Sequence, residues 1–138
     1  MSLEENKALV RRFVDEVQCR HNLAALDELY SPDFIDRSGM THPPNLESAR
    51  RFFSSMFAAF PDMRFTIRQE IAEGDKVVAH KTFHGTHLGP FMGIPATGKT
   101  VTIEVMDIYT VTGGLITEHW TVGDMLGMMQ QIGVVPGP

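Results

Sequence analysis

The spacing of apolar residues changes from helical to extended partway along the chain and divides it into two parts of different predicted structure. Over the first 60 residues, apolar side chains recur at intervals of three and four, which predicts amphipathic helices. The first helix begins after Ser2, which has capping-box spacing with Glu5. Its apolar stripe consists of Val10, Phe13, Val14 and Val17. Two further helices are predicted over 22–30 and 46–60, with a short extended piece at 34–36 between them.

After this helical part, apolar and polar residues alternate, which predicts strands. The predicted strands cover 63–73, 76–87, 100–112 and 115–122. Gly113-Gly114 is a typical two-residue hairpin connection between the last two strands. A loop over 85–99, dense in glycine and proline, joins the middle strands, and a short helix over 124–132 follows the last one. Helices first and hairpins second predict a single α+β domain, spanning 1–138, with helices packed on one face of a curved sheet.

The predicted strand over 100–112 is apolar on both faces. One face carries Val101, Ile103, Val105, Tyr109 and Val111. The other face carries Met106 and Ile108. Because the predicted helices cover only one face of the sheet, we expect a second copy of the chain to cover the other. This favours a homodimer, with a tetramer as the alternative.

The composition of the 138 residues is that of a globular domain, with 43% hydrophobic and 21% charged residues. A net charge of −5 argues against nucleic-acid binding, which needs a basic surface. No apolar run approaches the roughly 20 residues that cross a bilayer, so we expect no membrane association. The start of the chain is acidic where a secretion signal is basic, and we therefore expect a cytoplasmic protein. One cysteine, Cys19, excludes an internal disulfide.

Four segments of the chain resemble the SnoaL-like polyketide cyclase family. They are the loop Gly-Thr-His-x-Gly-x-Phe-x-Gly-Ile-Pro-x-Thr-Gly-Lys over 85–99, the segments 29–36 and 60–63, and Glu118-His119-Trp120 followed by Asp124. The resemblance covers about residues 6–133. It implies the cone-shaped α+β fold of the nuclear transport factor 2-like superfamily, which includes ketosteroid isomerases, scytalone dehydratase and limonene epoxide hydrolase. Since this fold supports many activities, the activity has to be argued from individual residues.

Two aspartates are the first candidates for acid–base chemistry. Asp124 lies between an apolar strand end and a methionine-rich segment, and the resemblance implies that it is the acid–base group of an aldol ring closure. The alternative is a structural role as the N-cap of the last helix. Asp36 occupies the position at which ketosteroid isomerases place their base. Where the family commonly has Asp-His, this chain has Asp36-Arg37, and the alternative for this pair is an ion pair at the surface.

The strand before Asp124 contributes further candidates. His119 is a third candidate catalytic residue, with a core or interface histidine as the alternative, and Trp120 is suited to stack on a flat ligand. The resemblance also implies a basic partner for the catalytic aspartate, near Thr110, and a threonine cannot carry a proton as an imidazole does. The residues that we expect to form the ligand pocket are Trp120, Phe53, Phe57, Met106, His80, His84 and Met125.

No metal site is predicted from the histidines. His80 and His84 share a strand face but lie about 13 Å apart at ~3.3 Å per residue, and zinc needs its ligands about 2 Å away. The chain contains no nucleotide-binding or phosphate-binding glycine motif, so no cofactor is predicted either. Cys19 has no acidic or histidine partner that the sequence places beside it.

The sequence therefore predicts a small cofactor-independent enzyme with an apolar pocket. Asp124 would exchange protons with an enolisable carbonyl compound, in an aldol cyclisation or an isomerisation. One alternative is a module that binds a hydrophobic small molecule without catalysis, which the threonine at 110 favours. The other alternative is a hydrolase or dehydratase of the same fold, with Asp36 and Arg37 or a histidine placing a water molecule.

Overall fold

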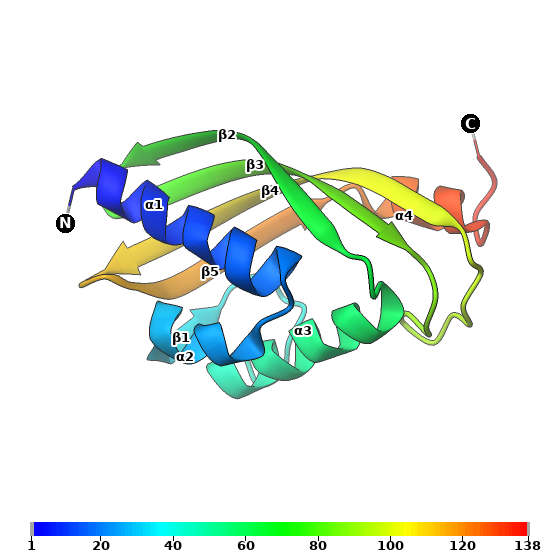
Figure 1. Ribbon diagram of the computed structural model, residues 1–138, viewed down its shortest axis with the longest axis horizontal. Coiled ribbons are helices and arrows are strands. Elements are labelled where there is room, and N and C mark those ends of the chain that lie inside the picture. Colours follow the sequence, from blue (N-terminus) through cyan, green and yellow to red (C-terminus); the bar gives the residue numbers. More distant parts are fainter. Residues whose placement is uncertain (1, 138) are drawn as a thin grey trace.

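The computed structural model describes residues 2–137, and its centre is a curved five-stranded sheet of order β1-β5-β4-β3-β2 (Figure 1). The strands are β1 (Tyr30–Asp36), β2 (Arg64–Glu73), β3 (Lys76–Thr86), β4 (Thr100–Thr112) and β5 (Leu115–Gly123). The helices are α1 (Leu3–Phe13), α2 (Leu26–Leu29), α3 (Leu46–Ala59) and α4 (Met125–Ile132). A π-helical turn, Val14–Cys19, extends α1, and a 3-10 turn, Leu23–Ala25, precedes α2.

The sheet is mixed. Strands β2, β3, β4 and β5 pair antiparallel in chain order, whereas β1 pairs parallel with β5 at one edge. Helices α1 and α3 lie against the concave face, so the molecule has a helical layer on one side of the curved sheet (Figure 1). The predicted α+β class, with N-terminal helices on a curved and mostly antiparallel sheet, is confirmed.

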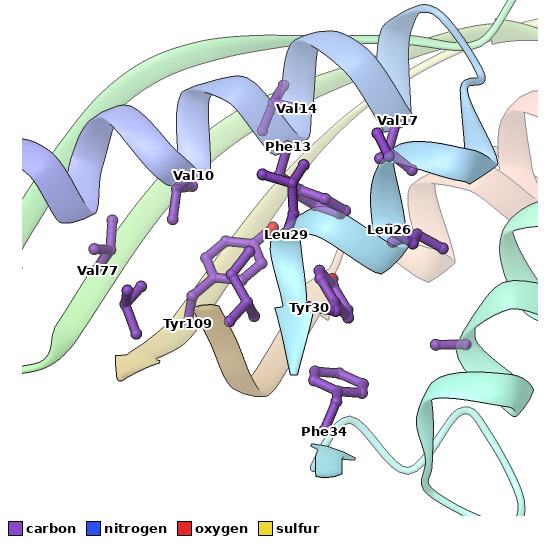
Figure 2. Close-up of a cluster of buried hydrophobic side chains, with 14 of the residues drawn as sticks. Val10, Phe13, Val14, Val17, Leu26, Leu29, Tyr30, Phe34, Val77 and Tyr109 are labelled. Carbon is purple, nitrogen blue, oxygen red and sulfur yellow. The ribbon is translucent and has the colours of Figure 1, made fainter. Parts of the chain in front are cut away.

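The predicted apolar stripe of the first helix is the centre of the core. The Ser2 hydroxyl accepts a hydrogen bond from the Glu5 backbone N–H, and the Glu5 carboxylate accepts one from the Ser2 backbone N–H, which starts α1 with a full capping box. Val10, Phe13 and Val17 have no exposed surface and pack toward β1 and the sheet (Figure 2). Burial of each such side chain contributes about 1.5–3 kcal/mol to folding.

Tyr30 begins a strand, although its spacing predicted the end of a helix. Helix α2 ends at Leu29, and the predicted extended piece at 34–36 proves to be the end of a longer strand, β1. Parallel pairing with β5, in which Tyr30 lies opposite Ile116, replaces the last helical turn. Pro32 is tolerated in β1 because this is an edge strand. No further strand pairs with its outer side, so the backbone N–H that proline lacks is not needed there.

The loop between β3 and β4 is attached to the end of α3 through Gly89. The backbone N–H groups of Leu88 and Gly89 both donate to the Ala59 carbonyl oxygen. A Cβ atom at Gly89 would lie 2.2 Å from the Ala58 carbonyl oxygen, so the loop has space only for glycine at this position. This contact holds the glycine-rich loop over the end of the core.

Substitution Gly89→Ala should therefore destabilise the protein. Because the colliding atom belongs to the backbone of α3, either the loop or the helix end must move, and we expect the free energy of unfolding to fall by about 1–3 kcal/mol. Urea unfolding measures this change. Gly137→Ala is the matched control, since a Cβ there meets no atom within 4 Å, and an equal loss in both variants would contradict the close-contact explanation.

The convex face of the sheet exposes apolar side chains, as the sequence predicted. Met106, Ile108 and Val122 are 48%, 38% and 75% exposed. The homodimer expected to cover this face remains a prediction. Within residues 2–137, no helix has the length and apolar character needed to cross a lipid bilayer.

Candidate functional site

A cavity of about 430 Å³ lies on the concave side of the sheet. Its lining includes six phenylalanines and six methionines, so the ligand environment is mainly apolar. Polar side chains also belong to the lining, namely those of Gln18, Tyr30, Asp36, Ser38, Asp107, His119 and Thr121. Met40 and Met92, which are 45% and 70% exposed, belong to the lining as well, so the cavity reaches the surface beside them. Apolar cavities with a few converging polar groups are typical ligand sites.

Asp107 and His119 form a hydrogen-bonded pair in the wall of this cavity. They lie on neighbouring strands β4 and β5, and His119 Nε2 is 2.7 Å from Asp107 Oδ1. The ring of Tyr109 stacks on the imidazole, with 4.8 Å between ring centroids and an angle of 10° between planes. Carboxylate and stacked ring together hold the imidazole in one orientation.

A buried lysine completes this group. Lys81 Nζ lies 2.7 Å from Asp107 Oδ2, 2.8 Å from Gln18 Oε1 and 3.0 Å from the Tyr109 hydroxyl. Gln18 and Tyr109 accept hydrogen bonds from the ammonium group, and Asp107 supplies its counter-charge. Lys81 has no exposed surface and Asp107 is 2% exposed, so they form a buried ion pair. Removing either charge would leave the other one buried without a counter-ion.

Asp107 is an anion in this environment. Burial alone would raise the pKa of Asp107, but the positive charge of Lys81 and the hydrogen bond with His119 outweigh it and hold the pKa well below its ordinary value. An ionised carboxylate can only accept, so His119 Nε2 carries the hydrogen and donates it. The basic nitrogen of the imidazole is therefore Nδ1, and within residues 2–137 the ring has no second hydrogen-bond partner.

The sequence carried a signal for this ion pair that our sequence analysis missed. Lys81 follows Val77 and Ala79 on the concave-facing side of β3, and Asp107 lies between Val105 and Tyr109 on the same side of β4. A single charged residue within an otherwise apolar strand face indicates either a polar site or a buried partner. Alternation places two such residues of opposite charge on the same face of adjacent strands, and this could have marked them as candidates for a buried pair.

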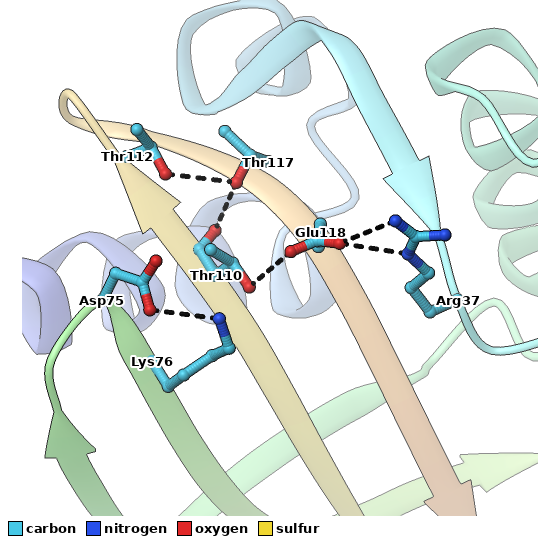
Figure 3. A network of polar contacts seen from close by, with 7 residues as sticks. All are labelled: Arg37, Asp75, Lys76, Thr110, Thr112, Thr117 and Glu118. Carbon is cyan, nitrogen blue, oxygen red and sulfur yellow. Dashed lines mark hydrogen bonds and ion pairs between the residues drawn. The ribbon is translucent and has the colours of Figure 1, made fainter.

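Asp36 also lies in the cavity wall, at the end of β1 and 9% exposed. Its Oδ1 accepts from the Ser38 backbone N–H at 2.8 Å, and its Oδ2 accepts from the Thr41 hydroxyl at 2.8 Å. The ion pair between Asp36 and Arg37 that the sequence left open does not form. Arg37 instead binds Glu118 on β5, with both N–O distances at 3.0 Å (Figure 3).

Thr110 is buried in the same polar network as Arg37 and does not line the cavity. Its hydroxyl donates to Glu118 Oε1 at 3.0 Å (Figure 3). The hydrogen bonds from Arg37 and Thr110 lower the pKa of the half-buried Glu118 carboxyl. The family resemblance implied a basic partner at this position, and the basic side chains of the cavity region, Lys81 and His119, come from the neighbouring strands.

Asp124 caps the last helix and is exposed. Its Oδ1 accepts from the Gly127 backbone N–H at 2.9 Å, and its own N–H donates to the Glu104 carbonyl. The side chain is not part of the cavity lining. Strand β5 ends at Gly123, and Asp124 then has the place and geometry of an N-cap, which was the structural alternative for this residue.

The predicted pocket residues are divided between the two faces of the sheet. Phe53 on α3 and Met125 on α4 line the cavity, whereas Phe57 packs beside it and stacks on His21 at 4.1 Å. The four remaining residues are absent from the cavity lining and lie on β3, β4 and β5 with side chains toward the convex face; they are His80, His84, Met106 and Trp120. We expected all four in the pocket, but strand alternation turns them away from it.

The convex-face histidines are held by polar neighbours. His80 Nε2 lies 3.0 Å from Glu104 Oε1. The pKa of His84 is lowered mainly by burial, and the positive charges of Arg64 and Arg68 lower it further. Among the described residues, no three His, Cys, Asp or Glu side chains are grouped in a way that could hold a metal ion.

Comparison with known proteins adds evidence about ancestry. The family model described as SnoaL-like polyketide cyclase matches residues 8–132. Aklanonic acid methyl ester cyclase DnrD of Streptomyces peucetius is 27% identical, over 91% of this chain and 88% of its own length. TsrD from Streptomyces laurentii has a similar structure, with a TM-score of 0.89, 27% identity and coverage of 98% of this chain and 99% of its own. IdmH from Streptomyces antibioticus also has a similar structure, with a TM-score of 0.82 and 30% identity. The match covers 93% of this chain and 98% of IdmH.

Proposed function

Because the chain belongs to the SnoaL-like polyketide cyclase family, we propose that it is a cyclase-like enzyme that moves a proton on an enolisable carbonyl compound held in the cavity. The single observation that carries this proposal is the imidazole of His119 in the wall of an apolar cavity, hydrogen-bonded at 2.7 Å to the buried carboxylate of Asp107. Two curated relatives, DnrD and DauD of Streptomyces, are named as cyclases of aklanonic acid methyl ester, which supports the cyclisation chemistry.

In this mechanism His119 is the proton carrier. Its Nδ1 removes a proton from the carbon beside the ligand carbonyl, and the C–H electron pair forms an enolate. The enolate carbon attacks a second carbonyl of the same molecule and forms a carbon–carbon bond. The alkoxide produced then takes the proton back from the imidazolium, so the enzyme returns to its starting state. Asp107 stabilises the imidazolium and keeps Nδ1 as the basic nitrogen, and Lys81 holds Asp107.

This assignment places the reaction on His119 and leaves Asp124 a structural role. Asp36 keeps a candidate role at the cavity, where its carboxylate can bind a ligand hydroxyl or a water molecule. The hydrolase or dehydratase alternative would use this second acidic group to place a water molecule. The two candidate functions therefore differ in whether water takes part in the reaction.

Deuterium exchange into 2-tetralone tests the proposed function. This small bicyclic ketone has acidic hydrogens beside its carbonyl, and NMR follows their replacement in D₂O. We expect the protein to accelerate exchange at C1 above the buffer rate. Binding without any acceleration would overturn the proposal in favour of a non-catalytic binding module. Uptake of oxygen-18 from labelled water into a substrate with an epoxide group would instead indicate the hydrolase alternative.

Substitution Asp124→Asn separates the two candidate proton carriers. Asparagine caps helices as well as aspartate does, so α4 should keep its start and the melting temperature should not change. The exchange rate of 2-tetralone should also stay within about twofold of the wild type, since the Asp124 side chain lies outside the cavity lining. Loss of exchange in a folded Asp124→Asn protein would return the catalytic role to this residue.

A further inference from the structure

The hydroxyl group of Tyr30 is buried and lacks a hydrogen-bond partner within the described residues. Tyr30 is 1% exposed, and it belongs to the cavity lining. Tyr109, the other tyrosine of the chain, differs in both respects, because its hydroxyl accepts from Lys81 and it does not line the cavity. Buried hydroxyl groups are normally paired, so the missing partner of Tyr30 needs an explanation.

Tyr30 is held firmly in the cavity wall, which also contains the carboxylates of Asp36 and Asp107. Its ring packs on Phe13 at 5.2 Å and on Phe34 at 4.5 Å between centroids, and its backbone is paired with β5 (Figure 2). Burial raises the pKa of Tyr30, and the negative charges of Asp107 and Asp36 raise it further. The hydroxyl therefore keeps its proton and remains available as a donor.

We propose that the Tyr30 hydroxyl donates a hydrogen bond to the carbonyl oxygen of the bound ligand and stabilises the negative charge that forms on this oxygen. The enolate made by His119 carries its charge on that oxygen, and a preorganised donor in an apolar cavity stabilises such a charge strongly. The ligand oxygen would also supply the acceptor that the folded protein lacks. This inference rests on the proposed function, because it names a contact of the same ligand in the same cavity.

The unpartnered hydroxyl makes an unusual prediction about stability. Removal of a buried donor that has no partner removes a desolvation penalty, so Tyr30→Phe should melt at the same or a higher temperature than the wild type. Tyr109→Phe is the matched comparison and should melt at a lower temperature, because it takes an acceptor away from the buried Lys81 ammonium. A lower melting temperature for Tyr30→Phe would assign its hydroxyl a structural role and overturn the inference.

Binding of two probes tests the contact itself. The probes are 2-tetralone, whose oxygen can only accept, and tetralin, the hydrocarbon of the same shape, each titrated by NMR. We expect the wild type to prefer the ketone, and Tyr30→Phe to bind the ketone about tenfold more weakly while binding tetralin unchanged. Equal ketone affinity in the two proteins, or a wild type without preference for the ketone, would overturn the inference.

The outcome for Tyr30 can be distinguished from that for the proposed function. Binding is measured without turnover, whereas the proposed function is measured by deuterium exchange. A protein that loses ketone affinity in Tyr30→Phe but never accelerates exchange would support the contact and refute the catalysis. A protein that accelerates exchange, but whose Tyr30→Phe variant keeps the wild-type affinity for the ketone, would support the catalysis and refute the contact.

Discussion

Substitution His119→Gln should lower the rate of deuterium exchange into 2-tetralone by at least about a hundredfold, which is the lower range of a general acid–base contribution. Glutamine can still donate a hydrogen bond from its amide to the Asp107 carboxylate, so the buried anion keeps a partner. It cannot take up a proton from carbon. The expected loss therefore comes from the chemistry and not from the fold.

Two measurements on His119→Gln separate these causes. Exchange followed by NMR gives the rate, and tetralin titration shows whether the apolar cavity is intact. We expect tetralin to bind as it does to the wild type, because the hydrocarbon makes no polar contact. A variant that keeps both tetralin binding and the wild-type exchange rate would exclude His119 as the proton carrier.

Substitution Asp107→Asn should destabilise the protein more than any other change considered, by about 3–5 kcal/mol. The reason is that Lys81 has no exposed surface, so neutralising Asp107 leaves an ammonium charge buried without a counter-ion. Urea unfolding at pH 7 measures the loss. The matched control is Asp27→Asn, which removes one carboxylate of the exposed pair with Arg50 and should cost less than about 1 kcal/mol.

A double variant, Lys81→Met with Asp107→Asn, tests the explanation. It removes both buried charges and should recover a large part of the lost stability, since replacing a buried ion pair by neutral groups is often tolerated. If the double variant were as unstable as the sum of its single changes, the loss would have to come from packing and not from the unpaired charge.

The contribution of Asp107 to stability should depend on pH in a defined direction. Its pKa is lower in the folded protein than the value of about 3.9 in an unfolded chain. The stabilisation is therefore complete above about pH 5 and is lost as the pH falls through the unfolded pKa toward the lower folded pKa. The difference in unfolding free energy between wild type and Asp107→Asn should be constant from about pH 8 to pH 5 and shrink only at more acidic pH.

Much of the fold could be predicted from the sequence, because it depends on local patterns. The boundaries of β4 at 100–112, the two-residue turn before β5 and the capping box of α1 follow from alternation, glycine placement and side-chain spacing. Tyr30 is the instructive exception. Its spacing fits a helix, but pairing with Ile116 of β5, which lies 86 residues further along the chain, decided that it begins a strand.

The candidate site was predicted less completely than the fold. His119, Asp36, Phe53 and Met125 were all chosen from the sequence and all line the cavity. Asp107 and Lys81 were overlooked, because neither belongs to the segments that carry the family resemblance. Trp120 and Met106 were expected in the cavity, but their strands turn them to the convex face.

The sequence by itself therefore determined the element types, their order and the family, since these depend on neighbours within a few residues and on contiguous motifs. The tertiary structure alone decided which side chains meet. Alternation says only that a residue faces one side of a strand, whereas strand order and register bring Asp107 to His119 and Lys81. The same packing leaves the Tyr30 hydroxyl without a partner in the cavity wall, which no local pattern could indicate.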